Sequence, residues 1–317
     1  GIYRMISSEQ SLKRNDSSSD HTGSIAVLGA NGRLGKILVS RLARSHRILE
    51  LTHDSMDLGD LASIHRALDE VALDVVILTA AMTAVDYCES HEAEAFAINA
   101  EGPREIARIC ADKGIKMVYI STDFVFDGEK NGPYTEGDEA FPINVYGSSK
   151  RMGEKHVLEA SKENLVVRVS WLFGSDGAAF PEWIIQQAMT RDAVALPEEK
   201  TGTPTFCEDL VTYLESLLML GGNSASGIVH LCNSGSCTWR EWGQFCVDAA
   251  IAAGLDIKAE RVGGNRLEDV AAFIAKRPVN SVLSTERFTR LTGIVPRNWR
   301  EAMAEHFSQT LKKSVGV

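Results

Sequence analysis

Short apolar runs alternate with longer segments of helical periodicity in the first half of the chain. The first run, "SIAVLGA", begins at Ser24, and apolar residues then recur at helical spacing at Leu34, Ile37, Leu38 and Leu42. The next run, "RILELT", is strand-like again. This order predicts a strand, a helix and a second strand.

The same alternation continues for about another hundred residues. Three more unbroken apolar runs are "DVVILTAA" from Asp74, "KMVYIST" from Lys116 and "LVVRVSW" from Leu165, and helix-length segments at 89–113 and 144–162 separate them. Continuous apolar runs are typical of parallel strands that are buried on both faces. The pattern therefore predicts an α/β fold with a doubly wound, Rossmann-like parallel sheet.

The alternation ends after residue 171, where glycines and prolines punctuate "FGSDGAAFPEW" and "PEEKTGTPT". A helix is expected in "CEDLVTYLESLLML", a strand in "GIVHL" and another helix in "TWREWGQFCVDAAIAAG". We expect a dinucleotide-binding domain at 23–170 plus about 206–232, and a smaller C-terminal substrate-binding lobe at 171–205 and 233–317. The polar, Ser-rich residues 1–22 are expected to form a disordered or expression-derived tail.

Composition narrows the class of protein. The 317 residues are 44% hydrophobic and 24% charged, and the net charge of -10 argues against nucleic acid or an anionic membrane surface as a partner. No apolar run reaches the roughly 20 residues that a membrane span needs. Six cysteines are scattered without a C-x-x-C pair or a secretory leader, which favours buried thiols in the cytoplasm.

A glycine-rich turn follows the first strand. "GANGRLG" places Gly29, Gly32 and Gly35 where a strand gives way to a helix, and backbone amides at such a turn can approach a pyrophosphate. The second strand ends "ELTHD" and lacks the acid that would bind a ribose 2′-hydroxyl at Thr52, whereas Arg33 can pair with a 2′-phosphate. NADP(H) is therefore the expected cofactor, with NAD(H) as the alternative. The residues assigned to it here are Gly29, Asn31, Gly32, Arg33, Leu34, Gly35, Asp57 and Leu58.

A second stretch, "PINVYGSSK", carries candidate chemistry. If a helix begins near Asn144, Tyr146 and Lys150 share one helix face, one turn apart. The fourth strand ends in "STDFVFDG", so Thr122 falls at the carboxyl edge of the sheet, where the nicotinamide should lie. Because a free phenol has a pKa near 10, a nearby ammonium is needed to make it a useful proton donor at neutral pH. Thr122, Tyr146 and Lys150 are therefore the predicted catalytic residues.

Taken together, these motifs resemble an extended short-chain dehydrogenase/reductase, and more narrowly the dTDP-4-dehydrorhamnose reductase family. The resemblance covers about residues 24–307 and rests on "GANGRLG", "AAMTAVDYCES", "STDFVFDG", "NVYGSSKRMGE", "RVSWLFG", "GTPT" and "RPVNSVLS". It implies NADPH-dependent reduction of the 4-keto group of a nucleotide-linked 6-deoxyhexulose, most simply dTDP-4-dehydrorhamnose to dTDP-rhamnose, by a monomer or homodimer. It also implies that Ala80, Ala81 and Asn99 lie along the cofactor, and that Val85, Asp123, Trp171 and Arg277 face sugar or diphosphate.

Two departures from the family pattern bear on the substrate and on metal binding. Phe124 stands where the family usually has tyrosine, so the substrate-facing hydroxyl is missing and the identity of the sugar stays open. Some relatives bridge two subunits through a metal held by acidic residues. This chain has Ile37 and Arg300 at two of the matching places and keeps Glu208, so no functional metal is expected.

Three other functions are alternatives for a chain with these motifs. A nucleotide-sugar 4,6-dehydratase needs an acid and a base beside the triad, but Asp123 is followed by Phe124, which cannot move a proton. A 4-epimerase can use the same triad and stays open. A non-catalytic NADP-binding subunit, resembling the regulatory β subunit of methionine adenosyltransferase, is disfavoured by Ser170 and Trp171, which are typical of the reductases.

Overall fold

The computed structural model describes residues 23–175, 179–220 and 225–311, and these form two compact units. Unit 1 contains residues 23–121, 145–167, 218–220 and 225–229. Unit 2 contains residues 122–144, 168–175, 179–217 and 230–311. The division assigns 122–144, 168–170, 206–217 and 230–232 to unit 2. The boundaries expected from the sequence, which stay a prediction, keep these residues with the dinucleotide-binding domain. The predicted tail, residues 1–22, lies outside the described residues.

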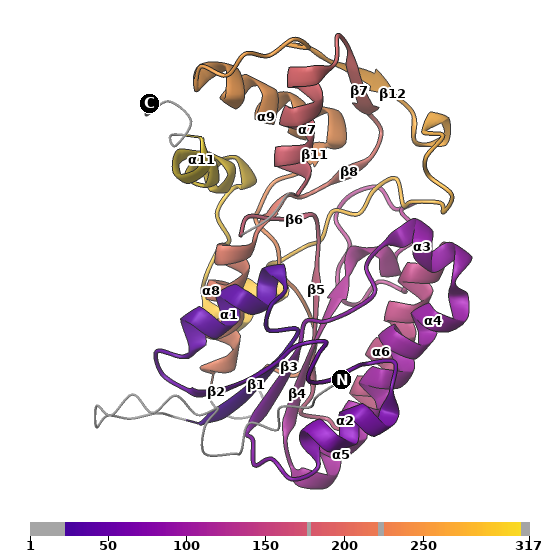
Figure 1. Cartoon of the computed structure of the whole chain (residues 1–317), viewed down its shortest axis with the longest axis vertical. Helices are drawn as coiled ribbons and strands as arrows, with labels where there is room; N and C mark the ends of the chain where they lie inside the picture. Colours follow the sequence, from indigo (N-terminus) through magenta and orange to yellow (C-terminus); the bar gives the residue numbers. More distant parts are fainter. Residues whose placement is uncertain (1–22, 176–178, 221–224, 312–317) are drawn as a thin grey trace. The chain divides into compact units, whose positions relative to one another are not determined.

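Unit 1 is built on a sheet with the strand order β10-β5-β4-β3-β1-β2 (Figure 1). Strand β1 pairs in parallel with both β2 and β3, and β3 pairs in parallel with β4. The strands are β1 Ser24–Leu28, β2 Arg47–Leu51, β3 Val75–Leu78, β4 Lys116–Thr122, β5 Leu165–Val169 and β10 Gly227–His230. Chain order reverses between β1 and β3, and ligands of doubly wound sheets bind at such a switch point. The predicted fold class is confirmed.

Helices cover both faces of this sheet, with α1 on one face and α2, α5 and α6 on the other (Figure 1). They are α1 Arg33–Leu42, α2 Leu61–Leu68, α3 Val85–Ser90, α4 Glu92–Phe96, α5 Gly102–Lys113 and α6 Val145–Ala160. The segment 89–113, expected as one helical stretch, is interrupted at His91, which leaves helical geometry with φ -135° and ψ 57°. A π-helical turn, Ala97–Glu101, then precedes α5.

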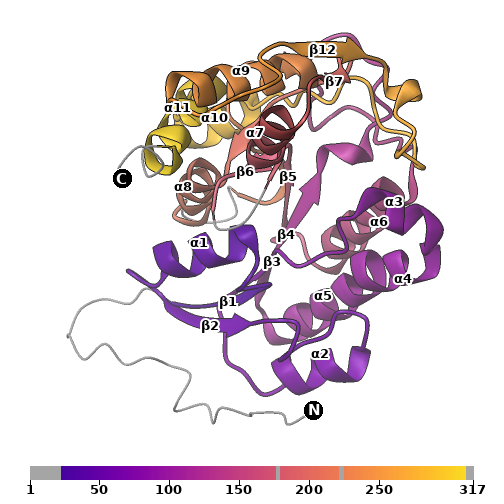
Figure 2. The same cartoon turned by 45° about the horizontal axis from the view of Figure 1, so that its top comes forward.

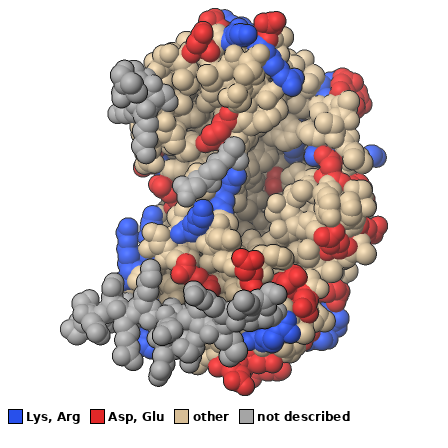
Figure 3. All heavy atoms as spheres, in the orientation of Figure 1, with Lys and Arg blue, Asp and Glu red and all other residues tan. Residues whose placement is uncertain are grey.

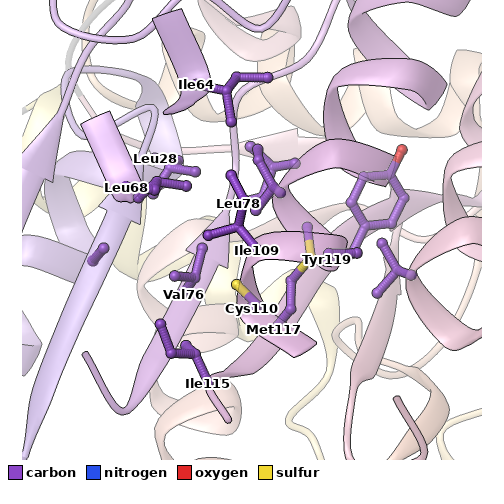
Figure 4. Packing of buried hydrophobic residues seen from close by; sticks show 14 of the residues in the cluster. Leu28, Ile64, Leu68, Val76, Leu78, Ile109, Cys110, Ile115, Met117 and Tyr119 are labelled. Carbon is purple, nitrogen blue, oxygen red and sulfur yellow. The ribbon is translucent and has the colours of Figure 1, made fainter. Parts of the chain in front are cut away.

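An aliphatic core joins the sheet to α2, α5 and α6. Figure 4 shows side chains from β1, β3 and β4 packed with those of the helices. The labelled members are Leu28, Ile64, Leu68, Val76, Leu78, Ile109, Cys110, Ile115, Met117 and Tyr119. Burial of these apolar strand residues on both faces explains why their sequence runs show no polar alternation.

Unit 2 has shorter strands and a more aromatic core. Its two-residue and four-residue strands pair as β12 with β7, β11 with β8 and β6 with β9. Helices α7, α9 and α11 lie close together (Figure 2). The buried core of this unit includes Phe173, Trp242 and Trp299. The elements are β6 Leu172–Phe173, α7 Phe180–Thr190, β7 Val194–Pro197, β8 Thr201–Gly202, β9 Thr205–Phe206, α8 Cys207–Leu218, β11 Cys237–Thr238, α9 Trp239–Ala252, β12 Val262–Asn265, α10 Glu286–Thr292 and α11 Trp299–Thr310.

The distribution of charged side chains and the burial of the cysteines can be compared with what the composition predicts. Figure 3 shows acidic and basic side chains interspersed over the described residues of one face. Within the described ranges no helix is both long and apolar enough to cross a membrane. All six cysteines are buried and free, and burial raises the pKa of the Cys110 and Cys232 thiols to about 12. These two thiols are therefore uncharged and poorly reactive at neutral pH.

Candidate active site

The glycine turn is held by backbone packing. Gly29 has φ +90°, a conformation that favours glycine, and its amide donates to the carbonyl of Leu51 at 2.8 Å. A Cβ atom at Gly35 would lie only 2.0 Å from the Gly29 carbonyl oxygen. The turn therefore needs glycine at both ends, which is why β1 can pass directly into α1.

The start of α1 fits a pyrophosphate. Gly32 is the N-cap residue and, among the described residues, no side chain caps it and no acidic residue lies in the first turn. Asn31 and Gly32 are exposed, whereas Leu34 is buried under the helix. The backbone amides at the start of a helix and the positive end of its dipole attract an anion. Arg33 is the first residue of α1, close to where a 2′-phosphate is expected.

The other predicted cofactor residues of the first half lie at the ends of strands in unit 1. The Ala80 amide donates to the Leu28 carbonyl at 3.1 Å, directly beside the glycine turn, and Ala81 follows it. The Asp57 carboxylate accepts from the Gly59 amide at 2.9 Å, and Leu58 is buried. These positions follow β3 and β2 in the chain, and ligands of doubly wound sheets bind beyond the carboxyl ends of the strands. The assignment of these residues to the cofactor stays a prediction.

Asn99 occupies the π-helical turn, and its side chain braces two neighbouring segments. Its Oδ1 accepts from the Met82 amide at 2.9 Å, while its Nδ2 donates to the Met82 carbonyl at 3.0 Å and to Ser149 Oγ at 3.0 Å. These bonds tie the segment after β3 to α6. Single π turns in helices are frequent at functional sites, and the assignment of Asn99 to the cofactor stays a prediction.

Helix α6 presents Tyr146 and Lys150 one turn apart. The helix begins at Val145, whose amide donates to Glu89 Oε2 at 2.9 Å, so the expected start near Asn144 and the shared helix face are confirmed. Lys150 is buried, and its Nζ donates to the Ile120 carbonyl of β4 at 2.7 Å. Tyr146 is half-buried.

The environment of Lys150 lowers its basicity. Burial lowers its pKa to about 7, and the Glu154 carboxylate opposes this change. Its ammonium also lies 4.3 Å from the centre of the Tyr119 ring, a cation–π contact that compensates part of the desolvation. The charge on Lys150 therefore changes near neutral pH.

A close contact fixes α6 against the π turn. A Cβ at Gly153 would lie 2.2 Å from the Asn99 carbonyl oxygen and 2.4 Å from the Tyr119 hydroxyl. That hydroxyl donates to the same carbonyl at 2.8 Å. Gly153 therefore sets how near the helix that carries Tyr146 and Lys150 lies to β4.

In unit 2, the last residue of β4 and the residue after it, Thr122 and Asp123, form a buried polar pair. Thr122 is the last residue of β4, two positions after Ile120. Its Oγ1 donates to Asp123 Oδ1 at 3.2 Å and accepts from the Phe124 amide at 3.1 Å. Asp123 is 2% exposed, and its Oδ2 has no hydrogen-bond partner among the described residues.

The predicted substrate residues Trp171 and Arg277 lie in unit 2, and Val85 begins α3 in unit 1. Trp171 has φ +45° and stacks on Trp242, with 5.5 Å between ring centres. The Arg277 guanidinium lies 3.8 Å from the centre of the Phe273 ring. Trp171 therefore belongs to an aromatic cluster, and its role toward the sugar stays a prediction.

Sequence reasoning missed Lys200. It lies just before β8 in "PEEKTGTPT", a segment interpreted only as loop, and it is fully buried beside Phe124 and Trp171. A lysine next to two glutamates is typical of a solvent-exposed loop, so the sequence does not indicate that Lys200 is buried.

The described residues contain no group of three His, Cys, Asp or Glu side chains that could hold a metal. Glu208 lies in the first turn of α8 and Arg300 in α11. The expectation that no metal is required stays a prediction.

The chain is similar to known proteins over most of its length. Residues 23–312 match the family model described as "RmlD substrate binding domain". A dTDP-4-dehydrorhamnose reductase of Streptomyces griseus is 35% identical over 89% of this chain and 92% of its own length. A probable dTDP-4,6-dihydroxy-2-methyloxan-3-one 4-ketoreductase of Streptomyces antibioticus is 36% identical over 90% of this chain and 95% of its own. The dTDP-4-dehydrorhamnose reductase of Bacillus anthracis, solved in complex with NADP, superposes with a TM-score of 0.83 at 31% identity, covering 90% of this chain and 99% of that one.

Proposed function

Because the chain belongs to the dTDP-4-dehydrorhamnose reductase family, we propose that it reduces the 4-keto group of a nucleotide-linked 6-deoxyhexulose with NADPH. The preferred substrate is dTDP-4-dehydrorhamnose, which becomes dTDP-rhamnose. The observation that carries the proposal is the buried ammonium of Lys150, held on β4 one helical turn from Tyr146. A Tyr–Lys pair on a helix that packs against a sheet with a glycine turn is suited to combined hydride and proton transfer.

The residues of the chain have distinct tasks in this reaction. NADPH, when bound, supplies the hydride that adds to C4 of the sugar. The Tyr146 phenol gives its proton to the keto oxygen, so that a hydroxyl forms, while the Thr122 hydroxyl donates a hydrogen bond to the same oxygen. The Lys150 ammonium stabilises the phenolate that remains, by charge.

The cellular setting is part of the proposal. The six buried thiols favour a reducing compartment, so we place the enzyme in the cytoplasm. It acts as a monomer or homodimer, and light scattering of the purified protein measures which.

The function is tested by following NADPH absorbance with a panel of enzymatically generated nucleotide 4-keto-6-deoxy sugars, with and without prior 3,5-epimerisation. We expect NADPH consumption that is fastest with the epimerised dTDP sugar. Sugar conversion with tightly bound cofactor and no NADPH consumption would instead indicate a 4-epimerase. A folded protein that binds NADPH but converts no member of the panel would favour the regulatory-subunit hypothesis and contradict the reductase.

A further inference from the structure

The first amide of helix α6 finds its hydrogen-bond acceptor on another helix of unit 1. Helix α6 begins at Val145, and the Val145 amide donates to Glu89 Oε2 at 2.9 Å. Glu89 belongs to α3 and precedes Val145 by 56 positions in the chain. The first turn of α6, which the structure describes in full, contains no acidic residue of its own. A carboxylate at this place satisfies an amide that a helix cannot pair internally and complements the positive end of the helix dipole.

This bond lies directly beside Tyr146. Tyr146 follows Val145, and its carbonyl accepts from Ser149 Oγ at 2.9 Å, while that hydroxyl accepts from Asn99 Nδ2 at 3.0 Å. The backbone is therefore held on both sides of Tyr146, at the preceding amide by Glu89 and at its own carbonyl by Ser149. Since the first turn of a helix tends to fray, these two bonds fix the place from which the phenol projects.

Glu89 is itself attached to a rigid part of unit 1. It is half-buried, and the residue before it, Cys88, is fully buried and donates from Sγ to the Met82 carbonyl at 3.6 Å. The backbone of Met82 is bonded in turn to both ends of the Asn99 side-chain amide, through its own amide and carbonyl. The carboxylate of Glu89 is thus anchored to the same π turn that holds Ser149.

We propose that Glu89 is a positioning residue, whose carboxylate fixes the first turn of α6 so that the Tyr146 phenol lies where it gives its proton to the keto oxygen. This inference rests on the proposed function and adds to it a residue outside the predicted catalytic set. Lys150 lies one turn further along α6 and has its own bond to the Ile120 carbonyl. Loss of the Glu89 bond should therefore displace Tyr146 and leave Lys150 and the cofactor in place.

The experiment compares Glu89→Ala with Glu94→Ala. Glu94 is a suitable control because its Oε2 accepts from the Tyr87 hydroxyl of α3 at 2.9 Å, so that both variants remove a carboxylate that is bonded in this region. Glu89→Ala should lower kcat about tenfold, as expected when a reacting group is displaced. Its Kd for NADPH should stay within about twofold, because a contact used only in the chemical step does not contribute to cofactor binding. Glu94→Ala should change neither constant.

Two conservative variants separate the hydrogen bond from the charge. Glu89→Gln keeps the length and an acceptor oxygen, so kcat should remain within about threefold of the wild-type value. Glu89→Asp keeps the charge but is one methylene group shorter, so it should lower kcat more than Glu89→Gln does. This pair also tests the inference if Glu89→Ala does not fold. Equal kcat values for wild type, Glu89→Gln and Glu89→Asp would contradict it.

A solvent isotope effect and a double mutant show whether the loss passes through Tyr146. In Glu89→Ala, proton transfer from the phenol is slower, so the effect of deuterium oxide on kcat should be larger than in the wild type. In Tyr146→Phe there is no proton left to position. Adding Glu89→Ala to Tyr146→Phe should therefore change kcat by less than about twofold, a strongly non-additive pair.

The outcomes separate this inference from the proposed function. An active wild-type enzyme with an unchanged kcat in folded Glu89→Ala would overturn the inference alone. Additive losses in the double mutant would do the same, and so would an equal loss of kcat and NADPH affinity in Glu89→Ala, which would indicate a general disturbance of unit 1. A wild-type protein that reduces no sugar of the panel would overturn the proposed function and this inference together.

Discussion

Among the described residues each compact unit buries one lysine, and the two lysines lie in different kinds of structural element. Lys150 belongs to a regular helix of unit 1 and donates to a neighbouring strand. Lys200 precedes a two-residue strand of unit 2 and is surrounded by aromatic rings. In a regular element, spacing along the sequence translates directly into position in space. In an irregular segment it does not, so only the lysine of unit 1 could be found from a motif.

The largest effect on kcat is expected from substitution of Tyr146, which lies one helical turn from Lys150. Tyr146→Phe keeps the ring and removes the transferable proton, so kcat should fall by roughly 10² to 10⁴, the usual contribution of one general acid. The Kd for NADPH should stay within about threefold, because the phenol proton is used only in the chemical step. Steady-state kinetics and a fluorescence titration measure the two quantities. A variant that keeps more than about a third of the wild-type turnover would show that this helix face is structural.

Substitution of Lys150 should have the next largest effect on kcat, and unlike Tyr146→Phe it should also lower the affinity for NADPH. Lys150→Met removes a charge and a contact to the cofactor ribose, so kcat and NADPH affinity should both fall, each by at least about tenfold. Lys155→Met, an exposed change in the same helix, is the control and should leave both unchanged.

The pH profile separates the charge of Lys150 from its packing. Because burial lowers the Lys150 pKa to about 7, the ammonium is present below that pH and is lost as pH rises through it. Wild-type kcat should therefore fall on the alkaline side, and Lys150→Met should lack this limb. An identical alkaline limb in wild type and variant would rule out Lys150 as its origin.

A matched pair of glycine substitutions tests whether unit 1 is the more rigid of the two. In Gly153→Ala the new methyl group meets backbone and a tyrosine hydroxyl, whereas in Gly243→Ala it meets the tip of the Leu196 side chain at 2.4 Å. Both positions are helical, so alanine gains the same propensity of roughly 1 kcal/mol. The free energy of unfolding should fall by about 1–3 kcal/mol for Gly153→Ala and change by less than about 1 kcal/mol for Gly243→Ala, since a side-chain tip can move. Urea denaturation measures both, and equal losses would contradict the difference in rigidity.

The smallest effect is expected on the preference for NADPH over NADH. Arg33→Ala should reduce the preference for NADPH over NADH by about tenfold, because one charge-assisted bond to the 2′-phosphate is lost. Lys36→Ala, an exposed change on the same helix, is the control. Competition titrations report the ratio of the two dissociation constants, and an unchanged ratio in Arg33→Ala would argue against this contact.

The contrast also explains which features were predictable. The sheet, the glycine turn and the Tyr146–Lys150 pair follow from repeating patterns of unbroken apolar strands and amphipathic helices. The predicted family and the predicted fold are both confirmed. The break at His91 and the π turn at Asn99 were not foreseen, because both fall inside a segment whose length alone is typical of one continuous helix.

The structure of unit 2 was harder to predict from the sequence, for a physical reason. Its strands β6, β8, β9 and β11 have two residues each, too few for any alternation to appear. Tertiary contacts determine its interior, as for Trp171, whose ring occupies space that a side chain at Gly202 would fill. Lys200 and Ser281 are far apart in the sequence and become neighbours only through such contacts. No local sequence pattern predicts that they are close in space.

The aromatic character of unit 2 has a spectroscopic consequence. All five tryptophans, Trp171, Trp183, Trp239, Trp242 and Trp299, lie in unit 2. Intrinsic tryptophan emission therefore reports on that unit alone, whereas far-ultraviolet circular dichroism reports on the helices of both. Coincident denaturation curves from the two signals would indicate one cooperative transition, and separated curves would show that the nucleotide-binding sheet and the aromatic unit unfold independently.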